Sequence, residues 1–200
     1  RGGTGVGVGG LAGREVRSRG GVRGEDVDHR VYGTVVHDPH APNIAREGGL
    51  ATLPKTVPAG TVSRACATAN QSIADAANLI ERGYADVVVA GGSESLTHIP
   101  ITIKQALAEK LIGVSKAKTL GARLGTLAKI RLKDLVPNFP QIAEPTTGES
   151  MGESAERMAK ENGITRADQD AWALRSHQLA AAGTQDGRLT SEPGPVYVPP

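Results

Sequence analysis

Apolar residues follow a strand period, then a helix period, then a strand period across the middle of the chain. Residues 56–62 are rich in Val and Thr, and Pro58 and Gly60 confine the predicted strand to the last few of them. Helical spacing follows, carried by Ile73, Ala76, Ala77 and Ile80. Gly83 is a typical helix stop. Residues 86–92 form an apolar run ending in a glycine pair, which predicts a strand buried on both faces.

The two ends of the chain follow neither period. Residues 1–24 hold ten glycines and five arginines. Such low-complexity composition is typical of disorder, and a reading-frame error in a GC-rich gene is the alternative. We therefore expect 1–24 to be irregular. At the other end, residues 194–200 look like a strand that is cut short. Between them, Thr165 and Asp168 have the spacing of a capping box and predict a helix that includes His177.

Composition excludes several classes of protein. An apolar content of 38% with 22% charged residues is typical of a soluble globular protein, and we expect a cytoplasmic one. A net charge of +2 gives no global field to attract nucleic acid. No apolar run approaches the ~20 residues that span a bilayer. His37 and His40 flank Asp38 in a proline-containing loop without a third ligand, so we expect no metal site.

Cys66 is the single cysteine among the 200 residues and stands between the first predicted strand and the predicted helix. An intrachain disulfide is therefore excluded. At a helix N-terminus the unpaired N–H groups and the macrodipole favour the thiolate, which is the reactive form of cysteine. A lone cysteine is more often a small buried apolar residue. Position alone therefore makes Cys66 a candidate nucleophile and leaves the buried alternative open.

Four motifs in order resemble the thiolases, enzymes that transfer an acyl group between a cysteine and coenzyme A. Residues 62–66, followed after the helix by 89–95, resemble the nucleophile and following-strand motifs. Residues 149–156, 163–170 and 173–178 resemble three motifs of the loop domain. Further upstream, residues 27–35 and 41–46 resemble the degradative 3-ketoacyl-CoA thiolases that pair with the multifunctional subunit of fatty-acid oxidation. The resemblance begins at Glu25 and covers about the first half of a thiolase.

This resemblance implies an α/β protein with the layered α-β-α fold of the thiolases, here its N-terminal half with the inserted loop domain. The expected divisions are an irregular segment at 1–24, a core at 25–97, a loop domain at 98–195 and a return to the core at 196–200. The family is usually dimeric or tetrameric, so we expect a homodimer or homotetramer.

The implied reaction is thiolytic cleavage of a 3-ketoacyl-CoA in fatty-acid β-oxidation, through an acyl group on Cys66. Coenzyme A is then a substrate, and no cofactor is expected. The resemblance places Met151 in the pantetheine and acyl channel, although a core methionine is as common on physical grounds. Gly91 and Gly92 could bring backbone N–H groups close to the reacting oxygen, or they could serve close strand packing.

Two alternatives remain beside the thiolase reading. A ketoacyl-synthase type of condensing enzyme shares the strand, cysteine and helix arrangement, but the loop-domain motifs favour a thiolase. A non-catalytic, truncated subunit that binds coenzyme A or a partner is the other. The family also uses a histidine in a Gly-His-Pro motif and a second cysteine, and these 200 residues contain neither. We expect this stretch alone to be inactive.

Residues 101–140 are basic and carry leucines at helical spacing. This segment contains eight basic residues and two acidic ones. The basic residues are Lys104, Lys110, Lys116, Lys118, Arg123, Lys129, Arg131 and Lys133, and the acidic ones are Glu109 and Asp134. The helical period is carried by Leu107, Leu111, Leu120, Leu124 and Leu127. A solvated helix that packs on the core explains this pattern as well as a contact surface does. The resemblance favours contact with a hydratase/dehydrogenase subunit or an anionic membrane over attraction of coenzyme A phosphates.

Overall fold

The computed structural model describes residues 5–138 and 143–195. The chain divides into two compact units, the first being Arg1–Pro100 with Gly194–Pro200 and the second Ile101–Pro193. The first unit contains a β-sheet and helices, whereas the described residues of the second unit are mainly helical. None of the helices within the described ranges is long and apolar enough to cross a membrane.

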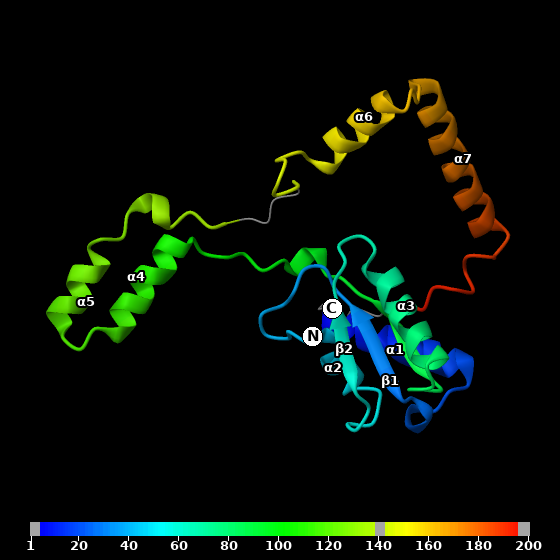
Figure 1. Ribbon diagram of the computed structural model, residues 1–200, viewed down its shortest axis with the longest axis horizontal. Helices are drawn as coiled ribbons and strands as arrows, with labels where there is room; N and C mark the ends of the chain where they lie inside the picture. Colours follow the sequence, from blue (N-terminus) through cyan, green and yellow to red (C-terminus); the bar gives the residue numbers. More distant parts are fainter. Residues whose placement is uncertain (1–4, 139–142, 196–200) are drawn as a thin grey trace. The chain divides into compact units, whose positions relative to one another are not determined.

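A parallel sheet organises the first unit. Its strands are β1 (His29–Gly33), β2 (Ala59–Val62) and β3 (Val88–Gly92), in the order β2-β1-β3. Gly33 pairs with Val62 on one side and Gly92 on the other. The strand predicted at the end of 56–62 and the strand within 86–92 are both confirmed. Figure 1 shows β1 beside β2, and the carboxyl ends of all three strands meet at one edge.

Helices cover both faces of this sheet. Successive residues of β1 point to opposite faces and so contact different helices. Arg30 and Tyr32 face α1 (Gly5–Gly20), and α2 (Ile44–Gly49) packs against β1 and β2 on that side. Gly33 faces the other layer, α3 (Thr68–Glu81). A small core forms around Tyr32, Ile44 and Ala45. The unit is therefore an α-β-α layered structure, as the α/β expectation requires.

The expectation of an irregular segment at 1–24 is wrong for its described part, because residues 5–20 form helix α1. Glycine lowers helix propensity and adds no apolar side chain to a periodic pattern, so the sequence conceals this helix. Tertiary packing compensates for the low propensity. Ser93 Oγ donates to the Gly5 carbonyl at 2.7 Å, and the buried Gly9 lets α1 approach the ring of Tyr32 closely.

Arg30 lies under α1 with its side chain fully buried, at 0% exposure. Its Nη2 donates to the Gly9 carbonyl at 3.0 Å, and its guanidinium carbon lies 4.3 Å from the ring centroid of Tyr32. Nε and Nη1 have no hydrogen-bond partner among the described residues. Burial of the charged guanidinium lowers the pKa of Arg30. Arg30 thus helps to hold α1, although only one of its three guanidinium nitrogens has a hydrogen-bond partner among the described residues.

Two predicted burial patterns differ from the structure. Helix α3 and its stop at Gly83 (φ +69°) are confirmed, but its buried residues are Thr68, Ser72 and Ala76. Ile73 and Ile80 of the predicted apolar stripe are exposed. In β3 only Val89 is buried, because this strand lies at the edge of the described sheet and has one neighbouring strand. Full burial of 86–92 on both faces is therefore wrong for this chain.

The second unit contains four α-helices in its described residues. They are α4 (Gln105–Lys116), α5 (Leu120–Leu127), α6 (Met151–Glu161) and α7 (Arg166–Gln185). The capping box of Thr165 and Asp168 opens α7 as predicted. Figure 1 shows α4 and α5 side by side as a hairpin. Lys110 of α4 forms an ion pair with the buried Asp134, in the short 3-10 helix Leu132–Asp134, at 2.5 Å. Two further 3-10 turns are Gly24–Asp26 and Leu96–His98.

Candidate active site

Cys66 is exposed and lies between the end of β2 at Val62 and the start of α3 at Thr68. The predicted strand-to-helix turn is therefore confirmed, and the buried alternative for this cysteine is wrong. The N-cap residue of α3, Ala67, supplies no side-chain hydrogen bond. Cys66 thus lies next to the N-terminus of α3, where the N-cap position supplies no capping side chain.

Two overlapping turns carry Cys66. The N–H of Ala67 donates to the Arg64 carbonyl at 3.1 Å, and the N–H of Thr68 donates to the Ala65 carbonyl at 3.1 Å. Ala65 has a φ of +46°, the left-handed region that costs a residue with a Cβ atom roughly 1–2 kcal/mol. Among the described residues it is the one non-glycine with positive φ. The sharp reversal there turns the chain so that Cys66 is presented to solvent.

A chain of side-chain hydrogen bonds runs from this turn along α3. Arg64 Nη1 donates to Gln71 Oε1 at 2.5 Å, and Gln71 Nε2 donates to Asp75 Oδ1 at 2.7 Å. Deeper in the helix, the fully buried Ser72 Oγ lies 2.8 Å from the carbonyl oxygen of Gly91 and 2.7 Å from that of Ala69. The contact between Ser72 and Gly91 joins α3 to β3.

Gly91 and Gly92 end β3 at the edge of the sheet where β2 leads into the Cys66 turn. A Cβ atom at Gly91 would lie 3.2 Å from the Tyr32 ring, and one at Gly92 would lie 3.0 Å from the carbonyl oxygen of Gly33. Close strand packing therefore gives both glycines a structural role. Donation of a backbone N–H to a reacting oxygen stays a prediction for both.

Glu94 has a role that sequence reasoning missed, although it lies within the Val89–Ser95 motif. Its carboxylate accepts hydrogen bonds from Thr34 Oγ1 at 3.0 Å, from the N–H of Val35 at 2.7 Å and from the N–H of Val36 at 3.2 Å. These contacts join the loop after β1 to the loop after β3. No periodicity signals such a clamp, because it depends on two segments about 60 residues apart in the chain.

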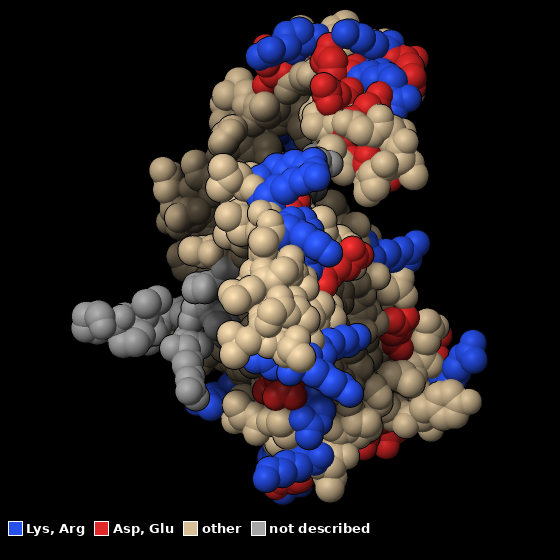
Figure 2. Space-filling model, turned by 90° about the vertical axis from the view of Figure 1, so that its left-hand side faces the viewer, with Lys and Arg blue, Asp and Glu red and all other residues tan. Residues whose placement is uncertain are grey.

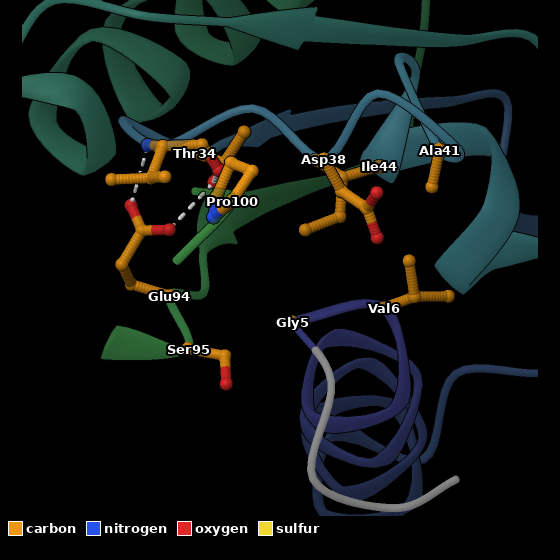
Figure 3. A pocket seen from close by; sticks show the side chains of 10 residues that line it. Gly5, Val6, Thr34, Asp38, Ala41, Ile44, Glu94, Ser95 and Pro100 are labelled. Carbon is orange, nitrogen blue, oxygen red and sulfur yellow. Dashed lines mark hydrogen bonds between the residues drawn. The ribbon is translucent and has the colours of Figure 1, made fainter. Parts of the chain in front are cut away.

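The loops joined by Glu94 border a small pocket, which also includes Gly5, Asp38 and Ile44. Figure 3 shows the Glu94 carboxylate pointing toward Thr34 on one side of this pocket. Its volume of about 50 Å³ is of the order of one or two water molecules. The backbone N–H of His40 lowers the pKa of the Asp38 carboxyl. This pocket is too small to hold an acyl-CoA.

Met151, the other predicted site residue, is the first residue of α6 and is 53% exposed. It belongs to the second unit, which is described separately from the unit that carries Cys66. Its place in an acyl channel stays a prediction. His177 lies within α7, as predicted, and is exposed.

Sequence comparison finds a family match and close relatives. The model described as thiolase, N-terminal domain, matches residues 6–200. The 3-ketoacyl-CoA thiolase of Yersinia enterocolitica serotype O:8 / biotype 1B is 46% identical over 98% of this chain and 45% of its own length. That of Yersinia pestis (strain Pestoides F) is 45% identical over the same shares. Because the match starts at residue 6, the expected start of the resemblance at Glu25 is wrong.

Structural comparison gives a similar result. The acetyl-CoA acetyltransferase of Bacillus anthracis superposes with a TM-score of 0.77 at 28% identity, over 98% of this chain and 46% of that one. The Acat5 thiolase of Ascaris suum, solved in complex with coenzyme A, gives 0.78 at 23% identity, over 96% and 46%. The latter shows the fold alone. The chain spans about half the length of the curated relatives it matches.

Proposed function

Because the chain belongs to the thiolase family through its N-terminal domain, we propose that the protein is an acyltransferase that uses coenzyme A to cleave 3-ketoacyl-CoA to acetyl-CoA and a shortened acyl-CoA. The observation that carries this proposal is the exposed Cys66 in the sharp turn at the N-terminus of α3. Relatives named 3-ketoacyl-CoA thiolase support thiolysis over the condensing-enzyme alternative. The proposed setting is fatty-acid β-oxidation, as the resemblance of residues 27–35 and 41–46 implies.

The proposed chemistry has two steps. In the first, the Cys66 thiolate attacks the 3-keto carbon, the bond between C2 and C3 breaks, and acetyl-CoA leaves as an enolate that takes up a proton. In the second, the thiol of another coenzyme A loses its proton and attacks the acyl-cysteine, which releases the shortened acyl-CoA and restores the thiolate. The resemblance assigns activation of the nucleophile to a histidine in a Gly-His-Pro motif and transfer of the proton to a second cysteine, and these 200 residues contain neither that motif nor a second cysteine.

Binding of the substrate follows from the same resemblance. Met151 would line the channel for pantetheine and the acyl chain, and Gly91 or Gly92 would offer a backbone N–H to the oxygen that gains negative charge. A homodimer or homotetramer is the proposed assembly. None of these proposals needs a bound cofactor, since coenzyme A enters as a substrate.

Replacement of the nucleophile tests the proposal. In the full-length protein that contains this chain, Cys66→Ser should lower coenzyme A-dependent cleavage of 3-ketoacyl-CoA by roughly 10³-fold or more, because a hydroxyl lacks the nucleophilicity of a thiolate. Circular dichroism should be unchanged, and mass spectrometry should find the acyl group on Cys66 of the unmodified protein.

The matched control is Ser18→Ala, which changes an exposed serine outside the motifs of the site and should leave turnover unchanged. If Cys66→Ser retains about a tenth of the original rate, another residue carries the acyl group. If the adduct appears on a different side chain, the assignment of Cys66 is wrong.

A second role is favoured by the α4–α5 hairpin. Leu120 and Leu124 are 76% and 60% exposed, beside exposed basic residues such as Lys116. Figure 2 views the structure from the side on which Figure 1 draws this hairpin, and blue Lys and Arg side chains and tan areas without charge both face the viewer. Exposed leucines among lysines are typical of a surface that binds anionic lipid. We propose that the hairpin contacts an anionic membrane, with an acidic hydratase/dehydrogenase subunit as the alternative partner.

Charge reversal tests this role. The triple variant Lys116→Glu, Lys118→Glu and Lys129→Glu should lose co-sedimentation with vesicles that contain anionic lipid while it keeps turnover on a short acyl-CoA. Binding of the unmodified protein should weaken with salt, because the Debye length is only ~8 Å at physiological ionic strength.

The control reverses three exposed charges in the other unit, Arg14→Glu, Lys55→Glu and Arg82→Glu, and should keep vesicle binding. Binding to an acidic subunit but not to vesicles would select the alternative partner. Loss of turnover with vesicle binding intact would instead place the hairpin at the coenzyme A site.

A further inference from the structure

The Thr68 side chain makes hydrogen bonds to the backbone of the turn that carries Cys66. Thr68 is 5% exposed. Thr68 Oγ1 accepts a hydrogen bond from the N–H of Arg64 at 2.8 Å and donates one to the carbonyl of Ala65 at 2.6 Å. A single hydroxyl group therefore holds the two residues that immediately precede Cys66. One of these two bonds is to the carbonyl of Ala65, the residue in the left-handed conformation.

Gly33 fixes the direction in which that hydroxyl points. A Cβ atom at Gly33 would lie 2.1 Å from Cγ2 of Thr68, a distance that two carbon atoms cannot share. The methyl group of Thr68 thus occupies the space that a side chain at Gly33 would fill. Because threonine is branched at Cβ, placing its methyl group fixes χ1 and so places Oγ1. The central strand β1 in this way sets the orientation of the hydroxyl at the start of α3.

We propose that Gly33 and Thr68 form a positioning pair that sets where the Cys66 thiol lies, a proposal that rests on the proposed role of Cys66. Neither residue touches the substrate. Gly33 receives the methyl group, Thr68 holds the backbone of Arg64 and Ala65, and that backbone presents Cys66. Geometry of this kind affects the chemical step more than binding, since misplacement by about 1 Å can cost 10²-fold in rate.

The first test separates the hydroxyl from the methyl group in the full-length protein. Thr68→Val keeps the branched shape and removes both hydrogen bonds, so kcat should fall roughly 10- to 100-fold with KM within about twofold. The rate at which iodoacetamide alkylates Cys66 should change in the same variant. Thr68→Ser keeps the hydroxyl and should keep kcat within about threefold. Equal kcat for Thr68→Val and the unmodified protein would overturn the proposal.

The second test uses the coupling between the two residues. Gly33→Ala should lower kcat, because the new methyl group displaces that of Thr68. Adding Thr68→Ser to Gly33→Ala removes the obstructing methyl group and should restore most of the loss. Gly60→Ala is the matched control, since a Cβ atom at that position of β2 meets nothing within 4 Å, and its kcat should be unchanged. A double variant no better than Gly33→Ala alone would contradict the coupling.

Failure of this proposal can be told apart from failure of the proposed function. If Cys66→Ser retains turnover, the nucleophile is wrong, yet the alkylation rate of Cys66 still reports whether Thr68 positions it. If Cys66→Ser is inactive and Thr68→Val matches the unmodified protein in kcat and alkylation, only the positioning pair is wrong. Should Gly33→Ala fail to fold, the comparison of Thr68→Val with Thr68→Ser decides the question by itself.

Discussion

Gly9 and Gly13 lie about one turn apart in α1, and both are buried next to Arg30. Their surroundings differ. A Cβ atom at Gly9 would lie 3.0 Å from both Ser93 Oγ and a ring carbon of Tyr32, whereas one at Gly13 would meet Arg30 at 3.7 Å, an ordinary contact. Since both glycines have the same intrinsic cost in a helix, the difference between them isolates packing.

We expect the two alanine variants to change stability in opposite directions. Gly13→Ala should stabilise the protein by about 0.5–1 kcal/mol through helix propensity alone. Gly9→Ala gains the same propensity but forces Tyr32 or Ser93 to move, and should destabilise by roughly 1–3 kcal/mol. Urea unfolding followed by circular dichroism measures both. A destabilising Gly13→Ala would mean that α1 lies closer to Arg30 than the structure shows.

At the turn itself, the sequence indicated the position of Cys66 but not the means of holding it. A change from β-branched residues to a helical period marks a strand-to-helix junction, and Cys66 stands at that change. Thr68 carries no such signal. Threonine near a helix start suggests an N-cap, yet here Ala67 is the N-cap, and the Thr68 hydroxyl bonds backward to Arg64 and Ala65. Only the packed strand beneath explains that direction.

At the scale of elements, the sequence predicted those helices and strands whose apolar or capping side chains recur at regular spacing. Helix α3, strand β3 and the capping box of α7 all follow from local sequence and are confirmed. Helix α1 could not be predicted in the same way. Six of its sixteen residues are glycine, so its inner face is made of backbone that no hydropathy pattern records. Its stability comes from contacts with Arg30 and Ser93, which are distant in sequence.

Exposure was the other property that local patterns could not supply. The spacing of Ile73 and Ile80 correctly indicated a helix, but the residues that touch the sheet are the small polar Thr68 and Ser72 with Ala76. A hydroxyl that bonds the backbone of a neighbouring segment can be buried as fully as an alkyl group. Ser72, at 0% exposure, satisfies this condition through its hydrogen bond. Hydropathy alone therefore predicts the burial of Ala76 correctly and that of Ile73 and Ile80 wrongly.

At the scale of the whole molecule, several carboxyl groups in both units have pKa values below their usual range. They accept hydrogen bonds from backbone N–H groups or from Arg, Lys, Ser and Thr side chains, and they are Asp26, Asp28, Asp38, Asp134, Glu153, Asp168 and Asp186. A folded-state pKa below the unfolded value means that the folded protein prefers the ionised form. The resulting stability is present above the unfolded value, near pH 4, and is lost as pH falls further.

We therefore expect acid to destabilise the protein below about pH 4, while these groups contribute equally at pH 6 and pH 8. Asp28 offers the clearest case, because the N–H groups of Val87 and Asp86 lower its pKa. Asp28→Asn should lower the thermal midpoint at pH 6, and the difference from the unmodified protein should shrink toward pH 2.5 as Asp28 becomes protonated. A difference that stays constant over this range would show that ionisation of Asp28 contributes nothing.

The contact between Gly33 and Thr68 also has a consequence for the history of the sequence. A methyl group can enter at Gly33 without a collision only after Thr68 has lost its own, whereas Thr68 can become serine at any time. The two substitutions therefore have a permitted order, with serine first and alanine second. A lineage that followed the reverse order would have passed through an ancestor with a displaced turn. Reconstructed ancestral sequences should thus carry alanine at position 33 only where position 68 is already serine.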